Sequence, residues 1–310
     1  MTLLTGLAAA VLFGLCFGSF ANVCIYRLPL LLFARDWRRT EDPDERRELL
    51  EIIDADPVRA RRKLDAVLGR NLNIATTRSQ CPQCRRQLTA RELVPVLSWL
   101  LQGGKCRGCG WRIPARYALV ELLCGLVFGA MWLRFGLAGD YLSLGMFALL
   151  GLTLVVVLFI DLDYRIIPNE ITYSGTALAL LLALFPHYPW SEQTVHLAGL
   201  GQGITGLLVA GGLTLAIYQV GSMMYGQEVL GMGDVKLMCM LGALLGWKLG
   251  VLALFLANIY GAVFGLSMVG LRLVTLKSMI PFGPYIVYAA FTVILAGPEA
   301  IAGYQRFMEM

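Results

Sequence analysis

Two acidic residues occur where the chain is otherwise strongly apolar. Asp161 follows the apolar run Leu152–Ile160, and Asp234 begins another apolar run within the segment Leu230–Lys236. Charge inside a bilayer is costly and is usually functional. Two carboxylates at the same depth can share one proton near neutral pH, so that one accepts a proton from water while the other polarises a peptide carbonyl. The pair therefore predicts the chemistry of an aspartic protease carried out in a membrane.

A plainer interpretation of the same residues is equally open at this point. Asp161 could pair with Arg165 at i,i+4, and Asp234 could cap a helix N-terminus. Asp163 is a second acid near the first position, but two residues correspond to roughly 200° around a helix. Asp161 and Asp163 therefore cannot both face Asp234, and Asp161 is favoured because it lies deeper in the apolar run.

Three neighbours of Asp234 are expected to shape the same site. Gly231 and Gly233 would let the backbone pass close to a substrate strand, because they carry no Cβ. Lys236, two residues after Asp234, could lower the pKa of that aspartate or anchor at the lipid headgroups.

Four of the eight cysteines form a pattern with metal-binding spacing. Cys81-x-x-Cys84 is followed, after 21 intervening residues, by Cys106-x-x-Cys109. Two such pairs complete a tetrahedral four-thiolate site, the favoured geometry of structural zinc, and leave no open position for catalysis. Disulfides do not persist in a cytosolic loop, and a redox pair would not need duplication. The remaining cysteines lie in apolar runs and are expected to be inert: Cys16, Cys24, Cys124 and Cys239.

The composition requires a membrane to hold these residues. The mean hydropathy is +0.67, and charged residues make up 15% of the chain against about 25% in soluble domains. A span needs about 20 mostly apolar residues, and the sequence predicts an all-α polytopic protein with about eight transmembrane helices. The expected spans are Leu3–Phe33, Tyr117–Phe135, Leu142–Leu162, Thr172–Phe185, His196–Val220, Val235–Gly246, Leu249–Leu271 and Pro284–Ala296.

Basic residues predict the orientation and the domains. Lys and Arg crowd into residues 35–116, so this segment is expected in the cytosol. The turns near Arg165 and Lys277 then also come out cytosolic, with Arg134 and Lys248 as exceptions. Nucleic-acid binding is not favoured, because acidic residues are interleaved with the basic ones. The expected domains are a first transmembrane helix (1–33), a cytosolic domain (34–115; charged insertion 34–78, zinc loop 79–115) and a transmembrane peptidase domain (116–310).

Several ordered motifs resemble the prepilin leader peptidases, which are GxGD-type aspartyl proteases of type IV pilus and type II secretion systems. Gly231-x-Gly-Asp-x-Lys236 is similar to their GxGD motif. The other similar segments are Phe17–Val23 with Tyr26–Pro29, the two cysteine pairs with Pro95-x-x-Ser-Trp99 between them, Arg116-Tyr-x-x-x-Glu121, Asp161 with Ile167-Pro-Asn169, and Pro281–Pro284. The resemblance covers nearly the whole chain except roughly Leu31–Arg78. It departs at Asn169, where many members have Asp.

The resemblance implies more than the residues show. It implies cleavage of prepilins or pseudopilins after a glycine, on the cytosolic side of the inner membrane of a bacterium, with Asp161 and Asp234 as catalytic residues. It also implies methylation of the new N-terminus by S-adenosylmethionine, for which the chain has no nucleotide-type fingerprint. Glu121 or Glu228 could bind the basic leader, or each could be a plain interfacial charge.

Two rival functions use the same residues. A polytopic ion- or proton-coupled transporter could carry its ions on Asp161 and Asp234, although transporters more often place such acids near the bilayer midplane. A non-catalytic assembly factor could use the zinc loop to bind partners. The sequence does not identify the oligomeric state or the particular prepilins.

Overall fold

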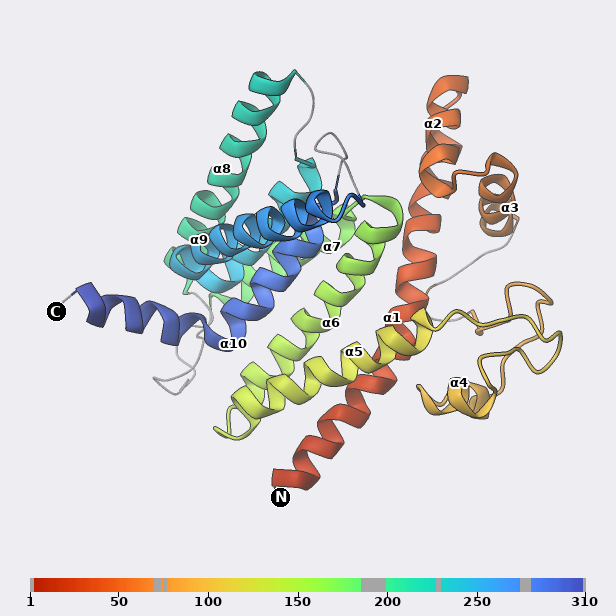
Figure 1. Ribbon diagram of the computed structural model, residues 1–310, viewed down its shortest axis with the longest axis horizontal. Helices are drawn as coiled ribbons and strands as arrows, with labels where there is room; N and C mark the ends of the chain where they lie inside the picture. The colour runs from red at the N-terminus through yellow and green to blue at the C-terminus, as the bar shows by residue number, and fades with distance from the viewer. Residues whose placement is uncertain are drawn as a thin grey trace. The chain divides into compact units, whose positions relative to one another are not determined.

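The computed structural model of the chain is almost entirely helical (Figure 1). It describes residues 3–69, 74, 77–184, 199–226, 230–273 and 280–308. The elements are α1 (Leu3–Arg39), α2 (Pro43–Ile53), α3 (Pro57–Leu68), η1 (Ala90–Leu93), α4 (Leu97–Leu101), α5 (Arg116–Met131), η2 (Trp132–Gly136), α6 (Tyr141–Tyr164), α7 (Asn169–Leu182), α8 (Leu200–Tyr225), α9 (Met232–Gly270) and α10 (Gly283–Met308). Extended pairing within these residues is limited to two isolated β-bridges in the cysteine-rich loop. The predicted all-α membrane fold is confirmed.

Six helices of the described chain are long and apolar enough to cross a membrane: α1, α5 with η2, α6, α8, α9 and α10. The predicted count of about eight differs at two places. Helix α7 has only 14 residues, fewer than a full span needs. Helix α9 has 39 residues but is interrupted at Gly246, whose φ of 79° and ψ of 172° are not helical. The sequence predicted two separate spans that meet near Gly246, and the structure has one long helix with a kink at this glycine.

The chain divides into two compact units, residues 1–132 with 150–165 and residues 133–149 with 166–310. In the first unit, α1 packs against α5 (Figure 1). The contact is close because glycines on α1 face α5: a Cβ at Gly14 would lie 2.6 Å from the carbonyl oxygen of Cys124, and one at Gly18 would lie 2.6 Å from the Cα of Glu121. Small residues allow this approach where lipid offers no hydrophobic drive for association.

In the second unit, α9 packs against α8, α7 and α10, and glycines meet where α8 and α9 cross (Figure 1). A Cβ at Gly206 of α8 would lie 2.1 Å from the carbonyl oxygen of Gly242, and one at Gly242 would lie 2.3 Å from the carbonyl oxygen of Gly206. Neither position has room for any side chain, so this pair of glycines fixes how α8 and α9 cross.

The charged insertion contains two helices, α2 and α3. Asp42 and Asp56 each cap a helix by accepting a bond from the backbone two residues on, and a proline follows each cap, a favoured combination at helix starts. Trp37 near the end of α1 has the guanidinium of Arg46 5.1 Å from its ring centroid and that of Arg61 4.8 Å away. These cation–π contacts join α2 and α3 to α1.

Arg134 and Lys248 are the two basic residues that do not fit the predicted cytosolic placement of Lys and Arg, and each has a partner nearby. Arg134 pairs with Glu299 of α10 at 2.5 Å, and Lys248 lies 5.8 Å from the ring centroid of Trp247. Lys277 and Glu228, also named from the sequence, lie outside the described residues.

Replacing Gly206 by Ala should lower the thermal midpoint of the detergent-solubilised protein by several degrees. The added methyl group would overlap the backbone of Gly242, and overpacking of this kind costs about 1–3 kcal/mol. The matched control is Gly212→Ala on the same helix, where a Cβ meets nothing within 4 Å and helix propensity favours alanine. Equal midpoints for the two variants would contradict the proposed crossing.

Candidate functional site

Asp161 lies in the last turn of α6, at the end of a buried aliphatic segment. Its residues from Leu154 to Ile160 are buried, and Asp161 itself is 5% exposed. The helix ends three residues later at Tyr164, and Arg165 adopts a left-handed φ of 53°. The backbone N–H of Arg165 donates to the carbonyl oxygen of Asp161 at 2.9 Å. The first predicted carboxylate thus lies at one end of a long apolar helix.

Asp163 has a different environment. It forms an ion pair with Arg116 at 2.5 Å, and its side chain is 29% exposed. Arg116 also donates to the carbonyl oxygen of Phe159 at 3.2 Å, and its guanidinium lies 4.9 Å from that ring's centroid. Asp163 therefore ties α6 to the start of α5.

Asp234 lies in the first turn of α9 and is 6% exposed. Its Oδ2 accepts a bond from the backbone N–H of Gly231 at 3.1 Å, and its own N–H donates to the carbonyl oxygen of Gly231 at 3.0 Å. This is the capping geometry expected from the sequence as a plain alternative. Capping also holds the carboxylate in one direction, which a reacting group requires.

The segment before α7 packs directly against the GxGD motif in the second unit. A Cβ at Gly233 would lie 3.0 Å from the Cβ of Ile167. Lys236 Nζ donates to Asn169 Oδ1 at 2.7 Å and lies 5.3 Å from the ring centroid of Tyr173. Any side chain at position 233 would therefore press against Ile167. The Asn169 bond to Lys236 was not anticipated, because the residues are 67 positions apart.

The four predicted metal ligands come together. The Sγ atoms of Cys81, Cys84, Cys106 and Cys109 lie within 4.8 Å of one another, with Cys81–Cys109 at 3.9 Å and Cys84–Cys106 at 4.0 Å. A tetrahedral ion with bonds of about 2.3 Å to sulfur separates its ligands by about 3.8 Å. The arrangement therefore fits a four-thiolate metal site.

The two cysteine pairs sit in equivalent turns. Cys81 N–H donates to the carbonyl oxygen of Arg86, and Cys106 N–H donates to that of Trp111. The residue after each second cysteine is left-handed, with φ of 59° at Arg85 and 70° at Gly110. Each turn thus presents two thiols from a short loop, as a metal knuckle requires.

Backbone donors favour the thiolate form of Cys106. The N–H of Gly108 donates to Cys106 Sγ at 3.4 Å, and backbone bonds from Gly108 and Cys109 lower the pKa of Cys106 to about 6. A ligand that is already deprotonated near neutral pH binds a metal ion without first losing a proton.

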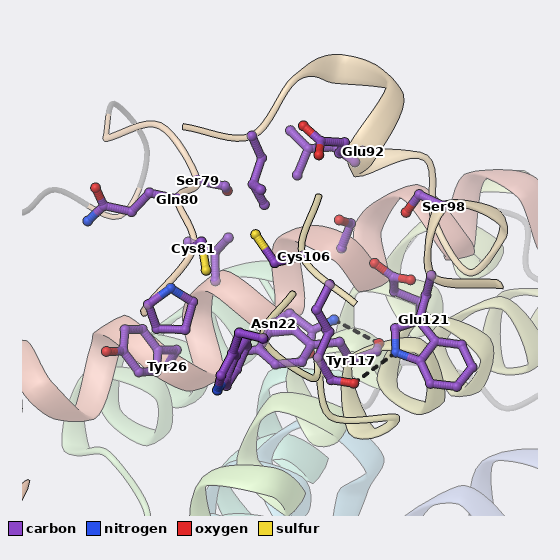
Figure 2. A pocket seen from close by; sticks show the side chains of 18 of the residues that line it. Asn22, Tyr26, Ser79, Gln80, Cys81, Glu92, Ser98, Cys106, Tyr117 and Glu121 are labelled. Atoms are coloured by element: carbon purple, nitrogen blue, oxygen red, sulfur yellow. Dashed lines mark hydrogen bonds between the residues drawn. The ribbon is translucent and has the colours of Figure 1, made fainter. Parts of the chain in front are cut away.

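The motifs around the cysteines form the wall of a cavity in the first unit (Figure 2). Asn22 Nδ2 donates to the carbonyl oxygen of Tyr117 at 3.0 Å, which joins α1 to α5. Glu121 Oε2 accepts from the backbone N–H of Val96 at 2.7 Å, which joins the loop to α5. Trp99 Nε1 donates to the carbonyl oxygen of Ile113 at 3.1 Å. Arg116, Tyr117 and Glu121 thus each contact a different part of the first unit: α6, α1 and the cysteine-rich loop.

Family profiles match two parts of the chain. The profile described as the bacterial peptidase A24 N-terminal domain matches residues 12–135, and that of the type IV leader peptidase family matches residues 148–266. No solved structure matches the chain significantly.

Curated relatives extend the similarity over nearly the full length. A protein of Stutzerimonas stutzeri is 33% identical over 97% of this chain and 94% of its own length. One of Aeromonas salmonicida is 37% identical over 94% and 91%, and one of Bacillus subtilis is 32% identical over 76% and 88%. Each of the three is named prepilin leader peptidase/N-methyltransferase.

Replacing Cys106 by Ser should abolish tight metal binding by the purified full-length protein. Serine offers a poorer ligand than a thiolate and leaves the site with three sulfurs. Elemental analysis should find one ion per chain in the wild type and less than about a tenth of that in the variant. Cys16→Ser, at an exposed position outside the cluster, should keep the wild-type content. A Cys106→Ser protein with full metal content would rule out the four-cysteine site.

Proposed function

Because the chain belongs to the type IV leader peptidase family, we propose that it is a membrane-embedded aspartic endopeptidase that removes the leader peptides of type IV prepilins or pseudopilins. The observation that carries this proposal is the similarity to prepilin leader peptidase/N-methyltransferases over almost the entire chain. The rival transporter has no support from these relatives. Six candidate spans make the protein a multi-pass membrane protein.

We propose Asp161 and Asp234 as the catalytic pair. Both carboxylates are buried at ends of apolar helices, and each occurs within a motif similar to the family's. One carboxylate takes a proton from water, whose oxygen attacks the scissile carbonyl carbon. The other donates a hydrogen bond to the carbonyl oxygen. When the C–N bond breaks, the leaving amine takes up a proton and becomes the new N-terminus.

The residues around Asp234 are proposed to hold it in place. Gly231 supplies the N–H that fixes one carboxylate oxygen, and Gly233 allows the segment before α7 to pack against the helix start. Lys236 links α9 to Asn169 of α7. Asn169 keeps this contact as a neutral acceptor, where many members of the family have Asp.

The proposed metal is a structural zinc ion held by Cys81, Cys84, Cys106 and Cys109. Four thiolates in tetrahedral reach are the typical zinc donor set, and with all positions taken the ion would organise the loop rather than act on substrate. The relatives' names support a second activity, N-methylation of the new terminus, for which S-adenosylmethionine is the methyl donor. The lone pair of the terminal amine would form the N–CH3 bond as the S–CH3 bond breaks, with the proton released to water.

The proposed location is the inner membrane of a bacterium, with the active site facing the cytosol. The arginine-rich segment 34–115 would then be the cytosolic domain, in keeping with the preference of basic loops for that side. The peptidase domain would comprise residues 116–310. Leader peptides of pilus or secretion-system pilins would approach from this side.

Asp161→Asn and Asp234→Asn should each lower the cleavage rate of a synthetic prepilin in liposomes by at least about 100-fold. Asparagine keeps the shape but cannot exchange a proton, and acid–base catalysis contributes about 10²–10⁴-fold. Cleavage is measured by mass spectrometry of the released leader, with folding checked by the thermal midpoint.

Asp163→Asn is the matched control, since its amide can still accept the bond from Arg116. It should cleave within about tenfold of the wild type. Normal cleavage by both Asp161→Asn and Asp234→Asn would refute the pair, and selective loss in Asp163→Asn would transfer the role to that residue.

A further inference from the structure

The first unit contains a cavity of 240 Å³ between α1, α3, α5 and the cysteine-rich loop (Figure 2). We propose that this cavity binds S-adenosylmethionine, the methyl donor of the proposed N-methylation. The assignment rests on the proposed function, because only a methyltransferase needs the donor. It adds the place of binding, for which the sequence gives no fingerprint.

Four aromatic side chains line the cavity: Tyr26, Trp99, Trp111 and Tyr117. The ring of Trp99 is held in place by its bond to the carbonyl oxygen of Ile113. Aromatic faces attract cations such as a sulfonium, and they stack on nucleobases with about 1–3 kcal/mol per base. S-adenosylmethionine carries both groups, a sulfonium ion and an adenine.

The wall also carries charged groups that can form hydrogen bonds with a ligand. Glu92 and Glu121 line the cavity together with Arg27. Backbone and side-chain bonds from Thr89 and the bond from Arg86 lower the pKa of Glu92 to about 2, so this carboxylate is ionised at neutral pH. Arg27 donates to the carbonyl oxygens of Ile74 and Thr77, which holds the segment after α3. S-adenosylmethionine has a net positive charge, and its ribose hydroxyls and ammonium are donors for carboxylates.

The cavity lies at the same end of the first unit as Asp161. Tyr117 lines it, and the adjacent Arg116 pairs with Asp163, two residues from Asp161. The amine that accepts the methyl group is created by cleavage, so a donor site near this carboxylate shortens the path between the two reactions. All the lining residues also fall within the match to the N-terminal domain at 12–135, outside the leader peptidase match at 148–266.

The size of the cavity suits the nucleoside part of the donor. Small-molecule sites commonly measure roughly 300–1,000 Å³. At 240 Å³ this cavity is smaller than that range, so it would hold the nucleoside and not the whole donor. Pro82 and Leu93 line the cavity and are exposed, so they lie at its mouth. The methionine end would extend there toward solvent.

The test is binding of tritiated S-adenosylmethionine to the full-length protein in detergent, measured beside prepilin cleavage. Ala118→Phe places a ring in the cavity from α5, and Ser98→Phe does so from α4, since both residues line it. Each variant should bind the donor at least tenfold more weakly and still cleave prepilin within about twofold of the wild type. Ala115→Phe, an exposed change three residues before Ala118 and outside the lining, should leave both properties unchanged.

The possible outcomes separate this proposal from the proposed function. Normal donor binding by Ala118→Phe and Ser98→Phe overturns the cavity assignment alone. A wild type that cleaves prepilin but binds no donor overturns both the methyltransferase proposal and the assignment. If the two variants keep donor binding but raise the KM for prepilin, the cavity is a leader-binding site and the assignment is wrong.

Discussion

The first two turns of α5 carry the contacts on which the first unit depends. Arg116 reaches α6 through Asp163 and Phe159, Tyr117 accepts a bond from Asn22 of α1, and Glu121 accepts one from Val96 of the cysteine-rich loop. Polar groups near a bilayer are stable only when they are paired. Because one helix supplies all three contacts, the end of α6 that carries the proposed carboxylate, the metal-binding loop and the cavity wall are fixed by the same short segment.

Glycine makes these contacts possible at the required distance. With a side chain at Gly14 or Gly18, α1 would be pushed away from α5, and the bond from Asn22 to Tyr117 would lengthen beyond reach. The second unit uses the same device where Gly206 meets Gly242, and again where Gly233 meets Ile167. In lipid, helices gain little from hydrophobic burial, so close backbone packing takes its place.

The sequence predicted features that depend on local spacing, and it missed those that depend on distant contacts. Each CxxC pair places two thiols on one short turn, so the four-cysteine cluster was predictable from the spacing. Gly246 also ended a predicted span where α9 is interrupted. By contrast, the bonds from Lys236 to Asn169 and from Val96 to Glu121 join residues 67 and 25 positions apart. Neither follows from periodicity or composition, because each depends on how helices pack.

Two reactions on one terminus impose an order that the first unit can satisfy. In the proposed reaction, the amine exists only after cleavage and belongs to the pilin product. A donor held at the end of the unit where Asp161 lies would meet this amine without requiring the product to leave. The loop that holds the proposed zinc supplies Trp99 and Trp111 to the cavity wall. Cys81 and Cys106 of the proposed metal site also line this cavity. Folding of the loop around a structural metal would therefore shape the donor site as well.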